Sequence, residues 1–129
     1  HLRFSKEAEG DLFIYTDKKR LSQVITNFLT NACKFTNSGY IKLGFKHLRG
    51  TDEAAIFVED SGIGLSEEEQ EKVFSRFFKQ NEFSQGAGLG LSICQGIVQN
   101  LGGRIALSSK QGEGSRFSVM LPVYKGGYA

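Results

Sequence analysis

A long amphipathic pattern between Leu21 and Phe35 constrains the fold of this chain more than any other stretch. Apolar side chains recur there at the spacing of a helix that packs one face on a core: Leu21, Val24, Ile25, Phe28, Leu29 and Ala32. Asn27, Asn31 and Lys34 form a polar row, which at about 100° per residue lies beside the apolar stripe and not opposite it. Such a row suits phosphate or a metal ion, but it is equally typical of a solvated face. The helix alone leaves both interpretations open.

Size and charge exclude several classes of protein. A length of 129 residues fits one domain with a single core. The net charge of +2 gives no reason to expect nucleic-acid binding. No apolar run approaches the roughly 18 residues of a membrane span, so we expect no membrane contact by this domain.

The chain starts without Met or an apolar leader, which favours an excised fragment of a longer protein. Cys33 and Cys94 lack a CxxC motif, and we expect both to be buried free thiols.

The periodicities predict an α/β chain. The expected elements, in chain order, are strands at 2–5 and 12–16, a helix from an N-cap at Asp17 to about Thr36, strands at 40–48 and 54–59, a helix at 67–74 after a Ser66–Glu69 capping box, a helix at 89–101, strands at 104–109 and 115–123, and a tail at 125–129. Residues 79–88 lack periodicity and predict a loop. Together these elements predict a two-layer α/β sandwich with a mixed, largely antiparallel sheet of about five strands, covered on one face by helices.

The glycines are clustered between the predicted elements. The chain has 16 glycines and 1 proline, and glycine is used where φ is positive or where a backbone approaches another group closely. The clusters are Gly62 and Gly64, then Gly86, Gly88 and Gly90, then Gly102 and Gly103, and finally Gly112 and Gly114. They predict turns, or a wall against a ligand.

The familiar nucleotide motifs are missing from the sequence. It contains no Gly-Lys pair for a P-loop, no GxGxxG after a first strand, and no HRD or DFG element of a eukaryotic-type protein kinase. Two physical features nevertheless suit a nucleotide. The run Gly86–Gly90 precedes the expected helix at 89–101, and free N–H groups at a helix start attract anions. Asp60 ends a predicted strand and can accept a hydrogen bond from an exocyclic amine such as adenine N6, although Asp-Ser-Gly alone is more typical of a plain turn.

Five motifs occur in the order of a known family. They are NFLTNACKFT, DSGIGL, VFSRFF, GAGLGLSI and GEGSRF. Over residues 1–124 the chain resembles the catalytic, ATP-binding domain of bacterial sensor histidine kinases, in the GHKL superfamily. The resemblance implies the Bergerat fold with a loop that forms an ATP lid, and ATP and Mg²⁺ as cofactors.

The resemblance also implies roles for single residues. Asn31 would coordinate Mg²⁺, Asn27 would lie against the phosphates or the water shell of the metal, and Lys34 would contact phosphate. These three would be the catalytic residues. Asp60 would bind adenine N6, directly and through water. The full implied ATP-binding set is Asn27, Asn31, Lys34, Phe35, Asp60, Gly62, Gly64, Leu65, Phe77, Phe78, Gly86, Ala87, Gly88, Leu89, Gly90 and Leu91.

Other implied roles have alternatives that remain open. Phe74, Phe77 and Phe78 would form the aromatic box at the base of the lid, but core packing explains Phe74 equally well. Arg76 or Lys79 would reach the phosphates. Gly112 and Gly114 would shape the last hairpin, or simply form a turn. Ala87 stands where the family often has Thr, which removes a hydroxyl but keeps the backbone N–H.

The implied reaction transfers the γ-phosphoryl group of ATP to a histidine. His1 and His47 lack the context of an acceptor, so we expect the acceptor on an upstream helical dimerisation domain, with a response regulator receiver domain as the next partner. The alternatives are a GHKL serine kinase, an ATPase, or a nucleotide-binding pseudokinase scaffold. Asn27 stands where the ATPases carry a Glu that activates water, and an amide cannot accept that proton. The resemblance implies a cytoplasmic domain and leaves open whether the full-length protein is anchored in the inner membrane.

Overall fold

The computed structural model describes residues 2–8, 16–48, 50–74 and 87–123. The elements are β1 (Leu2–Ala8), α1 (Lys18–Phe35), β2 (Gly39–His47), β3 (Glu53–Asp60), α2 (Glu67–Lys72), α3 (Ala87–Asn100), β4 (Arg104–Lys110) and β5 (Gly114–Pro122). The predicted strand at 12–16 falls almost entirely outside the described residues, as does the predicted tail at 125–129.

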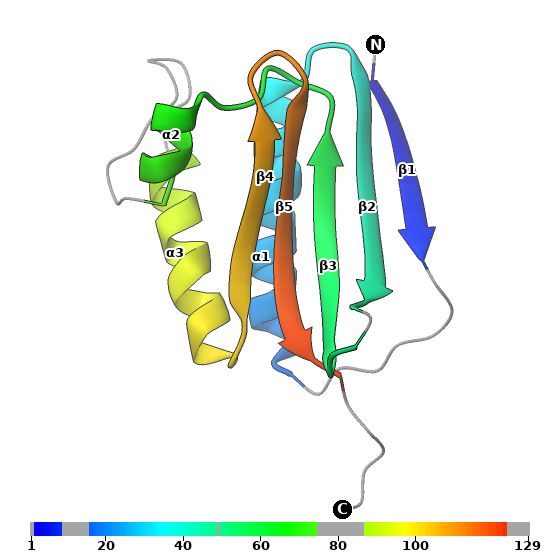
Figure 1. Cartoon of the computed structure of the whole chain (residues 1–129), viewed down its shortest axis with the longest axis vertical. Helices are drawn as coiled ribbons and strands as arrows, with labels where there is room; N and C mark the ends of the chain where they lie inside the picture. The colour runs from blue at the N-terminus through cyan, green and yellow to red at the C-terminus, as the bar shows by residue number, and fades with distance from the viewer. Residues whose placement is uncertain (1, 9–15, 49, 75–86, 124–129) are drawn as a thin grey trace, which may run out of the picture.

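The five strands form one mixed sheet in the order β1-β2-β3-β5-β4. β1 runs parallel to β2, and every other neighbouring pair is antiparallel. α1 and α3 lie side by side on one face of this sheet, and α2 lies beside the upper end of β4 (Figure 1). The predicted two-layer α/β sandwich is therefore confirmed. None of the helices that the structure describes is long and apolar enough to cross a membrane.

α1 packs on the sheet through the predicted apolar stripe. Asp17 caps the helix by accepting a hydrogen bond from the backbone N–H of Arg20 at 3.1 Å. Val24, Phe28 and Ala32 are buried, and the other three apolar positions of the stripe lie half-buried against the same core. Asn31 is the one polar side chain of α1 that is buried with them. α1 thus places the side-chain amide of Asn31 at the edge of the hydrophobic core.

Three predicted helix features need correction. α2 ends at Lys72 and not at Phe74, because Phe74 turns into the core and packs edge-on against Phe117 at 6.2 Å between ring centroids. α3 begins at Ala87 and not at Leu89, so two of the glycines lie inside its first turn. The first four N–H groups of a helix have no partner within the helix, so those of this turn are available to a ligand. Cys94 is buried as predicted, but Cys33 is exposed, because it lies away from the apolar stripe of α1.

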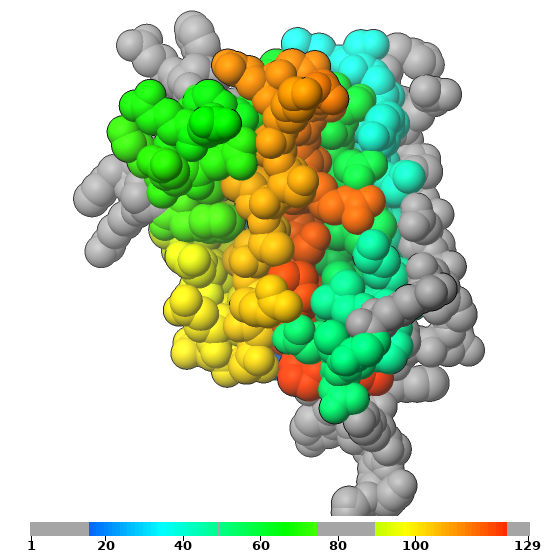
Figure 2. Space-filling model, viewed as in Figure 1, coloured from blue at the N-terminus to red at the C-terminus, as the bar shows by residue number. Residues whose placement is uncertain are grey.

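The face of the sheet opposite α1 and α3 is open, and Figure 2 views the molecule from that side. Glu59 on β3 binds Arg116 on β5 at 2.7 Å and accepts a hydrogen bond from the Tyr40 hydroxyl at 2.9 Å. The Arg116 guanidinium also lies 4.0 Å from the ring centroid of Phe57. Phe57 is only 1% exposed although it points to the open face, and this cover of charged side chains helps to bury it.

Candidate functional site

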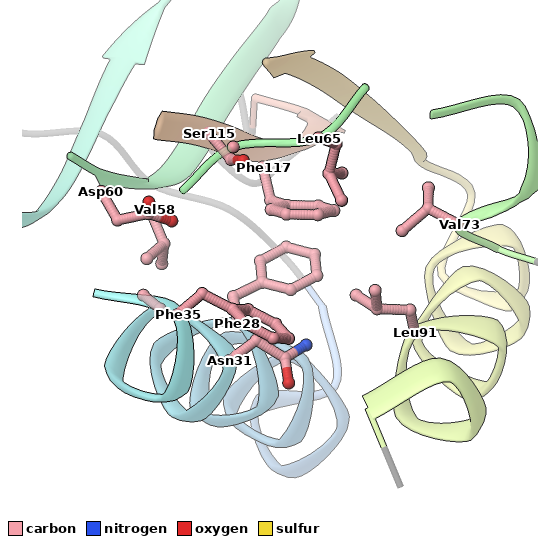
Figure 3. Close-up of a pocket in the computed structure, with 12 residues that line it drawn as sticks. Phe28, Asn31, Phe35, Val58, Asp60, Leu65, Val73, Leu91, Ser115 and Phe117 are labelled. Carbon is pink, nitrogen blue, oxygen red and sulfur yellow. The ribbon is translucent and has the colours of Figure 1, made fainter. Parts of the chain in front are cut away.

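A cavity opens between α1, α3 and the ends of β3 and β5 (Figure 3). The empty space at this site is about 500 Å³ when the part open to solvent is included. The lining residues are Phe28, Asn31, Ala32, Phe35, Val58, Asp60, Gly64, Leu65, Val73, Leu91, Ser115 and Phe117. Most of them are apolar, and the polar side chains are Asp60, Ser115 and Asn31.

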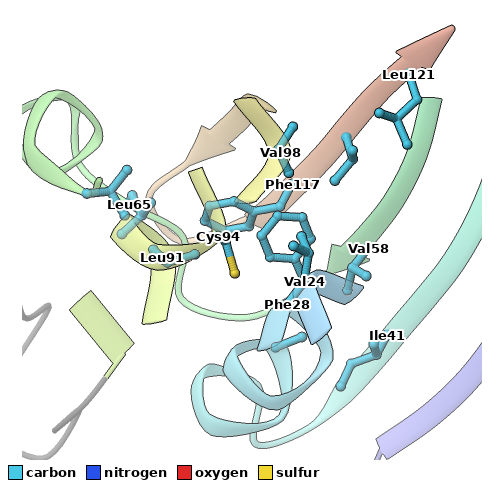
Figure 4. Packing of buried hydrophobic residues seen from close by; sticks show 13 residues of the cluster. Val24, Phe28, Ile41, Val58, Leu65, Leu91, Cys94, Val98, Phe117 and Leu121 are labelled. Atoms are coloured by element: carbon cyan, nitrogen blue, oxygen red, sulfur yellow. The ribbon is translucent and has the colours of Figure 1, made fainter. Parts of the chain in front are cut away.

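The apolar wall of the cavity is one end of the hydrophobic core (Figure 4). Phe28 and Phe117 pack with ring centroids 5.3 Å apart at an interplanar angle of 34°. Leu65 and Leu91 approach from the loop after β3 and from α3. Walls of this kind accept a flat apolar group such as a purine ring and exclude water from its edge.

A buried carboxylate forms one polar end of the cavity. Asp60 is 8% exposed and accepts a hydrogen bond from the backbone N–H of Gly62 at 2.8 Å. Burial raises the pKa of Asp60 above its usual value, and hydrogen bonds from the backbone N–H groups of Gly62 and Ser115 offset part of that rise. The backbone N–H groups orient the Asp60 carboxylate, which can accept a further hydrogen bond from a ligand.

Ser115 lies next to Asp60 because the two residues face each other across β3 and β5. Ser109 on β4 faces Ser115 in turn, so the three side chains form one row across three strands. The Ser109 hydroxyl lies 2.8 Å from the Ser115 hydroxyl and accepts the backbone N–H of Leu65 at 2.8 Å. Sequence reasoning missed both serines, although GEGSRF was already recognised as a motif and contains Ser115.

Thr36 lies behind Asp60, where α1 ends. Its side chain is 1% exposed, and its hydroxyl has no hydrogen-bond partner of standard geometry in the part of the chain that the structure describes. The Thr36 hydroxyl nevertheless interacts with Asp60 as a side-chain hydrogen-bond donor, and this interaction lowers the pKa of Asp60.

Gly62 and Gly64 hold the loop after β3 against its neighbours. A side chain at Gly62 would collide with the Phe35 carbonyl, and one at Gly64, where φ is +69°, would collide with the Lys110 carbonyl. Backbone atoms of neighbouring segments therefore occupy much of the space that a side chain at either glycine would need. Gly64 also lines the cavity.

The amides of α1 form the other polar end of the cavity. Asn31 is 5% exposed and donates its Nδ2 to Oδ1 of Asn27 at 3.3 Å. This bond leaves the Asn31 Oδ1 oxygen to act as an acceptor, and amide oxygens are ligands that Mg²⁺ accepts. No cluster of three acidic, His or Cys side chains that could hold a metal occurs within the described ranges. The residues therefore fit a metal held by one protein oxygen together with phosphate oxygens and water.

The start of α3 lies against the same amides. A β-carbon at Gly90 would lie 2.6 Å from Asn27 Nδ2, so the first turn of α3 contacts Asn27 closely. α3 is 14 residues long, and its N-terminal N–H groups and dipole favour an anion there. The N-terminal end of α3, where we expect an anion to bind, thus lies next to Asn27. Gly88 and Gly90 belong to the first turn of this helix and do not precede it.

The remaining expected site residues differ in how they are placed. Phe35, Leu65 and Leu91 line the cavity. Lys34 is exposed in the last turn of α1, outside the cavity lining. Ala87, Gly88 and Leu89 contribute backbone to the first turn of α3. Phe77, Phe78 and Gly86 lie outside the described residues, as do Arg76, Lys79 and His1.

The structure thus combines a two-layer sandwich with an apolar cavity, a carboxylate at one end of that cavity and amides at the other. The model of the family described as histidine kinase-, DNA gyrase B- and HSP90-like ATPase matches residues 16–125, and the chain belongs to this family. It is the GHKL ATP-binding domain of a sensor kinase, which confirms the resemblance.

The relatives are sensor kinases. Sensor histidine kinase RcsC of Escherichia coli K12 is 42% identical over 118 residues, which are 87% of this chain and 12% of RcsC. The adaptive-response sensory kinase SasA of Parasynechococcus marenigrum is 38% identical over 88% of this chain and 30% of its own length. The solved catalytic domain of histidine kinase ThkA is 34% identical with a TM-score of 0.79, over 94% of this chain and 78% of that one. The chain therefore spans a small part of the curated relatives.

Proposed function

We propose that this chain binds Mg²⁺-ATP in the cavity and donates the γ-phosphoryl group to a histidine on a separate helical domain. The observation that carries the proposal is the buried Asp60 carboxylate, which lines a largely apolar cavity. Adenine would donate its 6-amino group to Asp60 and lie against Phe35, Leu65 and Leu91. The triphosphate would then extend toward the amide row and the start of α3. The solved full-length ShkA in complex with AMPPNP, with a TM-score of 0.81 and 27% identity, supports a nucleotide in this fold.

The chain's own residues would position the phosphates. Asn31 would offer Oδ1 to Mg²⁺, which neutralises charge on the phosphate oxygens when it is bound. Asn27 would lie against the phosphates or the metal's water, held in place by its bond from Asn31 and its contact with Gly90. Lys34 would contact phosphate from the solvent side. Gly86 and the backbone from Ala87 to Gly90 would close over the triphosphate.

The same residues argue for transfer and against hydrolysis. A water molecule at the γ-phosphate would need a general base, and the amide of Asn27 cannot accept its proton. The acceptor histidine would belong to a dimerisation domain of the longer protein, and the phosphoryl group would pass on to a response regulator. We place the domain in the cytoplasm, where ATP is available.

Titration calorimetry of this chain with ATP, in the presence and absence of Mg²⁺, tests the binding step. We expect binding of modest affinity that Mg²⁺ strengthens, and no heat of binding at millimolar nucleotide would contradict the proposal. Radiolabelled ATP tests the transfer step. The chain alone should neither label itself nor hydrolyse ATP steadily, whereas the longer protein should form an acid-labile phosphohistidine. Steady hydrolysis by the chain alone would favour the ATPase alternative.

A further inference from the structure

The hydroxyl of Ser109 has three polar neighbours but only one proton. Its Oγ accepts the backbone N–H of Leu65 at 2.8 Å, donates to the carbonyl oxygen of Gly114 at 3.0 Å and lies 2.8 Å from Oγ of Ser115. A serine hydroxyl offers one donor and two acceptor positions. All three contacts are hydrogen bonds only if Ser115 donates its own proton to Ser109.

That proton direction decides what Ser115 offers to a ligand. Ser115 lies beside Asp60 at the polar end of the cavity (Figure 3). With its proton directed to Ser109, the Ser115 hydroxyl presents only lone pairs to the cavity. The ionised carboxylate of Asp60 also only accepts. Both side chains at this end of the cavity therefore accept hydrogen bonds, and neither donates one.

We infer that Ser109 is a positioning residue that makes the cavity selective for a purine with an amino group at position 6 over one with a keto oxygen. The inference rests on the proposed function, because it assumes that a purine occupies the cavity. A 6-amino group carries two N–H donors for the two acceptors. A 6-keto oxygen would face lone pairs on both side chains, and buried acceptors that face each other are unfavourable.

The surroundings hold Ser109 in this position. The side-chain amide of Gln70 on α2 donates to the backbone carbonyls of both Leu65 and Ser109 at 3.0 Å. α2, the loop after β3 and the β4–β5 hairpin are thereby tied together around the Ser109 hydroxyl. Ser109 acts on the base through the proton of Ser115 and not by touching the base.

The test compares ATP with inosine triphosphate (ITP), which carries a keto oxygen at position 6. Calorimetry gives the ratio of the two dissociation constants for each variant. The wild-type chain should prefer ATP. In Ser109→Ala the Ser115 proton is released and can be donated to the keto oxygen, so the preference should shift toward ITP by about tenfold. The double variant S109A/S115A should lack this shift. Ser108→Ala is the matched control, because Ser108 is exposed on the other face of β4 and its loss should leave the ratio unchanged.

The possible outcomes separate the inference from the proposed function. A wild-type chain that binds neither nucleotide would overturn both. A wild-type preference for ATP that Ser109→Ala leaves intact would overturn the inference alone. If thermal unfolding shows that Ser109→Ala does not fold, Ser115→Ala decides. Loss of that acceptor should weaken ATP binding more than ITP binding, and an unchanged ratio in that variant would overturn the inference.

Discussion

Gly90 and Asn27 lie against each other across the interface between α3 and α1, so that a side chain at Gly90 would require the Asn27 amide to move. A β-carbon there would lie 2.6 Å from Asn27 Nδ2 and 2.9 Å from Oδ1. The same Asn27 amide accepts a hydrogen bond from Asn31 through its Oδ1 oxygen. At Gly90 the start of α3 thus contacts the polar row of α1.

Gly90→Ala should displace the Asn27 side chain and weaken Mg²⁺-ATP binding by about tenfold, the equivalent of one hydrogen bond. The matched control is Gly96→Ala in the same helix, where a β-carbon would meet nothing within 4 Å. Gly96→Ala should stabilise the chain by about 0.5–1 kcal/mol and leave ATP binding unchanged. Urea unfolding and calorimetry measure the two effects. Wild-type affinity in Gly90→Ala would show that the Asn27 position does not matter for binding.

Asp60→Asn should separate stability from binding. Since burial raises the pKa of Asp60, the ionised carboxylate is disfavoured in the folded chain, and this penalty is fully present above the folded-state pKa. The variant should therefore unfold at a temperature no lower than that of the wild type. Its affinity for ATP should fall by about 10- to 100-fold, because an amide donor would face the 6-amino group. Unchanged affinity would rule out Asp60 as the adenine acceptor.

The raised pKa of Asp60 also predicts how binding depends on pH. A protonated carboxyl loses an acceptor, so ATP affinity should fall on acidification at a pH above 3.8, the ordinary value for Asp. Calorimetry across that range measures the fall, and Asp60→Asn is the control that should lack it. The same acid dependence in both proteins would assign it to another group.

Asn31→Ala should reduce the dependence of ATP binding on Mg²⁺. In the wild type we expect Mg²⁺ to strengthen ATP binding, because the Asn31 oxygen and the phosphates hold the ion together. In the variant this gain should shrink by about tenfold, while metal-free ATP binds nearly as before. Thr30→Ala, at an exposed neighbouring position of α1, is the control. An equal Mg²⁺ effect in Asn31→Ala would place the metal elsewhere.

Glu59 should make the fold sensitive to acid. Burial acts to raise the pKa of Glu59, but hydrogen bonds from Tyr40 and Arg116 outweigh it and lower the pKa. The stability from the ionised group is therefore present above the usual value of 4.5 and is lost as the pH falls through the lower folded-state value.

Glu59→Gln should lower the free energy of unfolding at neutral pH by about 1–2 kcal/mol, and the difference from the wild type should disappear in acid. Urea unfolding at several pH values measures this. Glu113→Gln removes the partner of an exposed ion pair with Lys110, whose side chains are 65% and 79% exposed, and should change nothing measurable. A pH-independent difference for Glu59→Gln would show that its charge does not contribute.

Local patterns predicted most of the helices and strands, whereas the roles of Asp60 and the amide row as parts of one site came from the family resemblance. The helical spacing from Leu21 to Phe35 predicted which face of α1 is buried, and Asp60 was predicted at a strand end. The start of α3 was placed two residues late, because the glycines have low helix propensity and only packing against α1 shows that they belong to the helix. The exposure of Cys33 and the packing of half-buried Phe74 against Phe117 likewise depend on neighbours that are distant in the sequence.

The sequence by itself determined that α1 carries a polar row at the edge of an apolar stripe, because helical periodicity is a local property. Only the tertiary structure decided that Asp60, Ser115 and Ser109 form one row, because strand register is set by pairing between distant segments. The tertiary structure also decided that Gly90 lies against the side chain of Asn27. The physical reason is the same in both cases: a hydrogen-bond partner or a close contact is supplied by another element, and no local pattern encodes which residue of that element it is.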